Sequence, residues 1–157
     1  MIVYRISKGR YVNDLSGKGA ELWGGRWNSA GTPMLYTSSN RALALLESLV
    51  HLPAGIAPAD YRLVTIEFPD TAKIGELSVV DLPPDWKKDP PEYDTQIIGD
   101  RFAADRQYLA LQVLSSIVGD YNFALNPRHP EFSLVKVVAV EPFVFDKRLL
   151  RLLGVFS

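Results

Sequence analysis

Short runs of β-branched and aromatic residues recur along the chain, while only one early segment has the clear periodicity of a helix. An alternating α/β fold would instead place a helix between successive strands. The pattern therefore predicts an α+β fold in which strands dominate. The expected strands are residues 2–6, 34–38, 61–68, 108–118, 134–140 and 143–146.

The clearest helix is predicted to begin at residues 38–40, Ser-Ser-Asn, because each of these side chains can accept a hydrogen bond from a free backbone N–H. Apolar residues then recur at helical spacing on a face centred near Ala42 and Leu46, and the helix should end before Pro53. Glu47 is expected at the edge of that face. A second, short helix is expected at residues 99–107, with irregular segments at 13–33, 81–92 and 126–132.

Composition limits the classes of protein to which this chain can belong. Its 157 residues are expected to form one domain, 1–157, with a core that needs no disulfides, and the chain has no cysteine. A net charge of −1, from 17 basic and 18 acidic residues, gives no general attraction to nucleic acid or to anionic lipid. No signal peptide or spanning segment is recognisable. We expect a soluble, cytoplasmic protein that binds neither membrane nor nucleic acid directly.

Three side chains near the N-terminus could carry chemistry. Glu47, at a core boundary, is either a solvated helix glutamate or a carboxylate aimed into a cleft. Arg26, within "GGRWN", is either a surface arginine or a planar fork for phosphate oxygens. Tyr36, at a strand end, either packs in the core or offers its ring face to a ligand while its hydroxyl stays solvated.

The sequence offers little support for a metal site, a phosphate-binding loop or a serine nucleophile. His51 and His129 lack the spacing of metal ligands, so no metal is expected. "SGKGAE" lacks the spacing of a phosphate-binding loop, and no nucleophile elbow is present. Ser115 and Ser116 lie in an apolar run, where a hydroxyl needs a hydrogen-bonding partner.

Taken together and in order, the motifs of this chain resemble the RES domain, the toxin component of RES–Xre toxin–antitoxin pairs. The resemblance places the family's arginine on Arg26, its tyrosine on Tyr36 and its glutamate on Glu47. The family's serine falls on Ser115, with Ser116 as the alternative, because Leu114 stands where a proline is usual. The motifs are "YRI", "GKGA", "GGRWN", "LYTS", "LALLE", "LPPDW", "IGD", "VLSSIV", "NFALNPRHPEF" and "FVFDKRL".

The resemblance implies a single RES domain with a fold like that of ADP-ribosyltransferases, in which small sheets and short helices surround an NAD-binding cleft. It implies an enzyme that degrades NAD as a substrate, without a further cofactor, and so arrests growth. An Xre-type helix-turn-helix antitoxin would cover the cleft, and toxin protomers would pair within the complex.

In such an enzyme Glu47 would stabilise the cationic ribose formed when nicotinamide leaves, because electrostatic help is most effective where charge develops. Arg26 would hold the phosphates, Tyr36 would stack on nicotinamide, and Ser115 would hydrogen-bond nicotinamide or ribose. We expect these groups to converge on one dinucleotide-sized hollow.

The acceptor, water or inorganic phosphate, stays open. A second hypothesis is transfer of ADP-ribose to a protein, with residues 83–94, including Trp86, as an acceptor-recognising loop or a lid. A third is a catalytically silent binding module.

Overall fold

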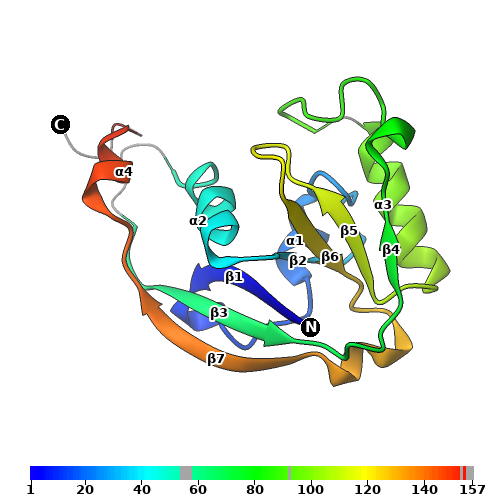
Figure 1. Ribbon diagram of the computed structural model, residues 1–157, viewed down its shortest axis with the longest axis horizontal. Helices are drawn as coiled ribbons and strands as arrows, with labels where there is room; N and C mark the ends of the chain where they lie inside the picture. The colour runs from blue at the N-terminus through cyan, green and yellow to red at the C-terminus, as the bar shows by residue number, and fades with distance from the viewer. Residues whose placement is uncertain (54–57, 92, 153, 155–157) are drawn as a thin grey trace.

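A single mixed sheet of seven strands organises the molecule, in the order β4-β5-β6-β2-β1-β3-β7 (Figure 1). The computed structural model describes residues 1–53, 58–91, 93–152 and 154. Only the β4–β5 pair is parallel, and the other neighbours are antiparallel. The predicted α+β class is confirmed. The strands are β1 (Ile2–Lys8), β2 (Leu35–Ser38), β3 (Tyr61–Glu67), β4 (Ile74–Glu76), β5 (Ala110–Leu114), β6 (Tyr121–Leu125) and β7 (Lys136–Phe143).

The pairing between neighbouring strands is shortest where β1 meets β2. These strands share one registered pair, Tyr4 with Ser38, whereas β1 pairs with β3 along its whole length. Figure 1 shows the consequence, because β1, β3 and β7 form one arm of the molecule and β4, β5 and β6 stand in another. The expected small sheets are thus joined into one continuous but strongly bent sheet.

Helix α2 (Arg41–Leu49) lies against β1 and β2, beside this short pairing. Its N-cap is Asn40, whose side chain accepts from the backbone N–H of Leu43, as predicted. The predicted face is confirmed at Leu46 but wrong at Ala42, which is exposed while Leu43 and Ala44 are buried. The helix has two apolar contacts rather than one. Leu43 and Ala44 are buried, while Leu45, Leu46 and Leu49 pack with Phe143, Phe145 and Leu150 near the C-terminus.

Helix α3 (Tyr93–Asp105) begins earlier than the helix expected at 99–107. Its buried residues are Thr95, Gly99, Phe102 and Ala103, so two of the four carry no strong apolar signal. Gly99 permits a very close approach to the loop at Trp27: a Cβ there would lie 1.6 Å from the Trp27 carbonyl oxygen. Helix α3 is therefore fixed against the segment that carries Arg26.

Several other boundaries differ from the prediction. Residues 143–146 do not form a separate closing strand, because β7 already includes Phe143 and Phe145 turns into a buried cluster. Strands β4 and β6 have no predicted counterpart. Strand β4 has three residues with a central glycine, and β6 includes Asn122, and both residue types are poor strand formers.

Short helices lie within or beside the segments expected to be irregular. They are α1 (Lys18–Trp23), η1 (Gly9–Tyr11), η2 (Val79–Asp81) and η3 (Pro130–Leu134). The C-terminal segment packs through Leu150 of α4 (Lys147–Leu152), while residues 153 and 155–157 lie outside the described residues. Within the described part of the chain, no helix is both long and apolar enough to cross a bilayer.

Candidate functional site

Glu47 lies on the side of α2 that carries the buried Leu43 and Ala44. Its carboxylate accepts two hydrogen bonds from side chains of the sheet region. Its Oε1 accepts from the Ser115 hydroxyl at 2.9 Å and from the Asn122 side-chain amide at 2.5 Å. These contacts join a helix, the end of β5 and the start of β6. Glu47 is thus not a solvated helix glutamate.

Ser115 immediately follows β5 and is 1 % exposed. Its hydroxyl accepts from the backbone N–H groups of Ile117 at 3.1 Å and Val118 at 3.3 Å, which orients its own proton toward Glu47. Ser115, rather than Ser116, is therefore the serine at the carboxylate. Its predicted contact with the substrate stays a prediction.

Asn122 was not among the residues expected at the site. It lies on β6 directly opposite Ser38 of β2, and the Ser38 hydroxyl donates to its Oδ1 at 2.7 Å. Its Nδ2 is thereby turned toward Glu47. The sequence gives little local signal for this residue, because a lone asparagine near a loop more often indicates a turn.

The start of α2 is clamped to the loop between β5 and β6. The Asn40 side-chain amide donates to Asp120 Oδ2 at 2.6 Å, and the backbone N–H of Ser39 donates to the Tyr121 carbonyl at 3.1 Å. Hydrogen bonds from the Tyr121 N–H and from Asn40 lower the pKa of Asp120 below its ordinary value. This clamp fixes the helix that carries Glu47 relative to Ser115.

Tyr36, on β2, has a half-buried side chain with a fully engaged hydroxyl. The hydroxyl donates to Asn28 Oδ1 at 2.7 Å and accepts from the Trp27 N–H at 3.0 Å. Of the two interpretations of Tyr36, the one with a solvated hydroxyl is therefore wrong. Burial raises the pKa of Tyr36 above its ordinary value. Stacking of its ring on a ligand stays a prediction.

Asn28 locks the loop to which Arg26 belongs. It is fully buried, and its amide donates to the carbonyls of Ala20 and Thr32 at 2.8 and 2.9 Å. From this loop, Arg26 directs Nη1 toward the carbonyls of Trp86 and Lys88, the second at 2.9 Å. Among the described residues, Nε and Nη2 of Arg26 have no hydrogen-bonding partner. That edge can still form a fork with an anion.

Arg26, Tyr36 and Glu47 lie close enough together to interact electrostatically. Burial lowers the pKa of Arg26, while the nearby Asp89, Glu47 and Tyr36 act in the opposite direction on that pKa. Trp86, placed by hypothesis in an acceptor-recognising loop or a lid, is buried, with its ring 6.2 Å from that of Trp27. Its side chain is therefore not available to contact an acceptor protein.

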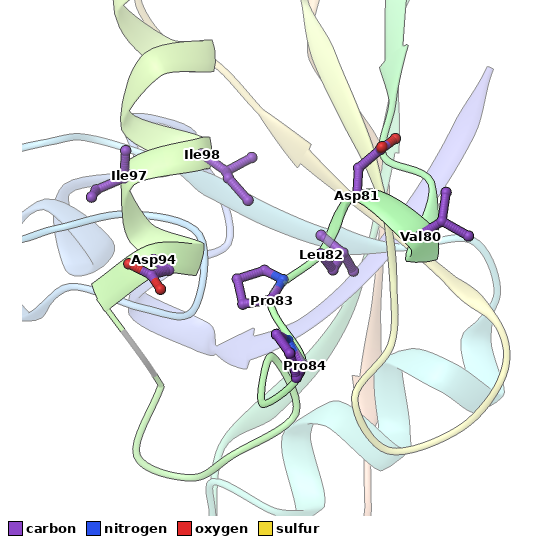
Figure 2. A pocket seen from close by; sticks show the side chains of 8 residues that line it. All are labelled: Val80, Asp81, Leu82, Pro83, Pro84, Asp94, Ile97 and Ile98. Atoms are coloured by element: carbon purple, nitrogen blue, oxygen red, sulfur yellow. The ribbon is translucent and has the colours of Figure 1, made fainter.

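Two surface hollows lie away from these residues. One, of about 450 Å³, separates the segment Val80–Pro84 from Asp94, Ile97 and Ile98 of α3, as Figure 2 shows. The other lies between β4 and the far end of α3. Neither is lined by Arg26, Tyr36 or Glu47. No group of three or more Asp, Glu or His side chains in the described residues is arranged to hold a metal ion.

Comparisons with known proteins show the family to which the chain belongs. The RES domain family model matches residues 2–146. A protein of Pseudomonas putida named "Toxin Res" is 40% identical over 154 residues, covering 95% of this chain and 99% of the relative. The "Prs ADP-ribosylating toxin" of a Sphingobium species is 37% identical over 143 residues, covering 89% of each chain.

A solved structure has the same fold. It is a chain in the crystal structure of the M. tuberculosis MbcT–MbcA toxin–antitoxin complex, with a TM-score of 0.72 and 20% identity. The match covers 97% of this chain and 87% of that one. Because the family model spans nearly all of the sequence and relatives reach 40% identity over almost their whole length, this chain belongs to the RES domain family.

Proposed function

We propose that this chain is the toxin of a toxin–antitoxin pair and that it cleaves the bond between nicotinamide and ribose in NAD. The observation that carries the proposal is the Glu47 carboxylate, fixed by Ser115 and Asn122 and close enough to Arg26 to act on its pKa. Membership of the RES family and the names of the relatives support the toxin role.

The proposed reaction needs a fixed negative charge more than an acid. When the N-glycosidic bond breaks, its electron pair moves to the nicotinamide nitrogen, which becomes neutral, and positive charge develops on the ribose. A preorganised carboxylate stabilises that charge. An oxygen of water or an anionic oxygen of inorganic phosphate then supplies the electron pair of the new bond to C1′, and an attacking water loses one proton to solvent.

Arg26 would hold the pyrophosphate of NAD. Its Nη1 is committed to two carbonyls, so its Nε and Nη2 would form the fork to phosphate. Tyr36 would place its ring against nicotinamide while Asn28 holds its hydroxyl. NAD is thus the substrate in this scheme, and no additional cofactor takes part.

A second candidate is transfer of ADP-ribose to a protein. It is favoured by one relative, 37% identical to this chain, that is named an ADP-ribosylating toxin. The bond broken is the same, and the acceptor is a protein side chain in place of water or phosphate. Glu47 has the same role in both reactions.

The proposed partner is an antitoxin, and its proposed class is Xre-type helix-turn-helix. The structural neighbour comes from a toxin–antitoxin complex, which supports a partner of this kind. Pairing of toxin protomers within such a complex, and action in the cytoplasm, belong to the same proposal. Co-expression with an Xre-type helix-turn-helix antitoxin that binds this chain should restore growth and yield a stable complex.

The central experiment incubates purified protein with NAD labelled in its adenine and measures nicotinamide release. Glu47→Ala should reduce release by about a hundredfold or more at equal folded protein, the scale of losing one preorganised electrostatic group. Glu131→Ala, which removes an exposed carboxylate from η3, should leave release unchanged.

The label also separates the candidate reactions. Label in small molecules supports degradation of NAD, and the product mass separates water from phosphate as acceptor. Label on protein supports transfer. Near-normal release by the folded Glu47→Ala variant would refute the proposal.

A further inference from the structure

The two oxygens of Glu47 are in different environments. Oε1 accepts both hydrogen bonds, from Ser115 and from Asn122. Within the described residues, Oε2 accepts none. One oxygen is therefore an anchor, and the other is left for a ligand.

The Asn122 amide is held between the Ser38 hydroxyl and the Glu47 carboxylate. Because β2 and β6 pair in register at these two residues, their side chains lie on the same face of the sheet. The Ser38 hydroxyl, only 4 % exposed, donates to Asn122 Oδ1, which leaves Nδ2 to donate to Glu47. The flipped amide would place two acceptors against each other at Glu47, so the network permits only this orientation.

From this geometry, and on the basis of the proposed function, we propose that Ser38 and Asn122 are positioning residues for NAD cleavage. They act through Glu47, holding Oε1 so that Oε2 faces the reacting ribose. Ser115 supports the same oxygen from the end of β5, where two backbone N–H groups fix its hydroxyl. Oε1 of the carboxylate is thus held from β6 and from the end of β5.

The alternative is that Asn122 only attaches α2 to the sheet. That role predicts a loss of folded protein with no change in the activity of each folded molecule. The positioning role predicts a lower kcat with little change in KM, because a misplaced carboxylate weakens transition-state stabilisation more than substrate binding.

The first test does not depend on any reaction. A crystal structure of Asn122→Ala should show the Glu47 carboxylate rotated, or in more than one orientation, and Ser38→Ala should show the Asn122 amide released. A Glu47 side chain that keeps its place in both variants would overturn the proposal, whatever the protein does to NAD.

The second test measures kcat and KM for NAD, with Asn13→Ala, an exposed asparagine, as the matched control. Asn122→Ala should lower kcat by about 10- to 100-fold, with KM within about threefold, and Ser38→Ala should have a smaller effect in the same direction. Unchanged kcat per folded molecule would contradict the proposal.

A pH profile adds a readout that a purely structural role would not give. Asn122→Asp replaces the donor by a carboxylate against Glu47 and should be less active than Asn122→Ala at pH 8. Its activity relative to Asn122→Ala should rise as the pH falls, because protonation of the introduced carboxyl restores a donor. A pH-independent ratio would count against the role. If the wild type releases no nicotinamide, the proposed function fails, and the crystallographic test still decides the positioning of Glu47.

Discussion

The two ends of the candidate site are built in different ways. Glu47 lies on α2 and is held by side chains from β6 and the end of β5, so its position is set by regular structure. Arg26 comes from a loop, and its guanidinium donates to the backbone carbonyls of Trp86 and Lys88 in a second, proline-rich loop. Regular elements hold a side chain more tightly than loops do.

This difference suggests a division of roles between the two ends. A group that stabilises charge in the transition state needs a fixed position before the substrate arrives. A group that holds phosphate can adjust as the substrate binds. We therefore expect changes at the Glu47 end to act mainly on kcat and changes at the Arg26 end mainly on KM, and the following predictions test that contrast.

The largest effect should come from Gly99→Ala, which would place a Cβ 1.6 Å from the carbonyl oxygen of Trp27. Helix α3 must then move away from the Arg26 loop, at a cost of about 3 kcal/mol or more. Urea unfolding should measure this loss. The matched control is Gly19→Ala in α1, where a Cβ meets nothing within 4 Å, and where stability should rise by about 0.5–1 kcal/mol. Equal stability of the two variants would contradict the close packing.

The next effect concerns Arg26. Replacement by alanine should lower kcat/KM for NAD by about 100-fold, or about 2.7 kcal/mol, mostly through KM. Arg26→Lys should recover only part of this loss, because an ammonium cannot form the planar fork. Arg101→Ala, an exposed arginine on α3, is the control. A loss confined to kcat would break the proposed contrast between the two ends.

A smaller effect is expected for Tyr36→Phe. The buried Asn28 oxygen and the Trp27 N–H each lose a partner, which should reduce the free energy of unfolding by about 1–2 kcal/mol. The ring remains, so activity per folded molecule should stay within a few-fold. A large fall in kcat without loss of stability would instead assign the hydroxyl a part in the chemistry.

The same residue should affect stability at high pH. The pKa of Tyr36 is raised in the folded protein, so above about pH 10 the unfolded chain releases a proton that the folded chain retains. Its contribution to stability is complete below that pH and falls as the pH rises further. Tyr36→Phe should remove part of this alkaline decline in urea midpoints. An unchanged slope would contradict the burial of the hydroxyl.

Local patterns in the sequence predict part of this molecule well. The Asn40 cap and the strand at Tyr61–Glu67 follow from side-chain capping and residue alternation, and both are present. The short strands β4 and β6 are set by pairing with distant strands rather than by their own residues. The start of α3 cannot be predicted from the pattern of apolar residues, because Thr95 and Gly99 are among the residues that the helix buries.

The candidate site divides in a similar way. Sequence motifs identify Arg26, Tyr36 and Glu47 as candidates. Their environment depends on contacts with residues that are distant in the sequence. The Glu47–Asn122 hydrogen bond joins residues 75 positions apart, and the bond between Arg26 and Trp86 joins residues 60 apart. Asn122 could not be identified from its neighbours, because its role exists only through the β2–β6 register.

The most direct test of the whole account is a structure of the slowly reacting Glu47→Gln variant with NAD bound. One molecule of NAD should span both ends, with its pyrophosphate at Nε and Nη2 of Arg26 and its nicotinamide ribose beside the amide introduced at position 47. NAD bound in the hollow between Val80 and Ile98, or touching only one of the two ends, would contradict the account.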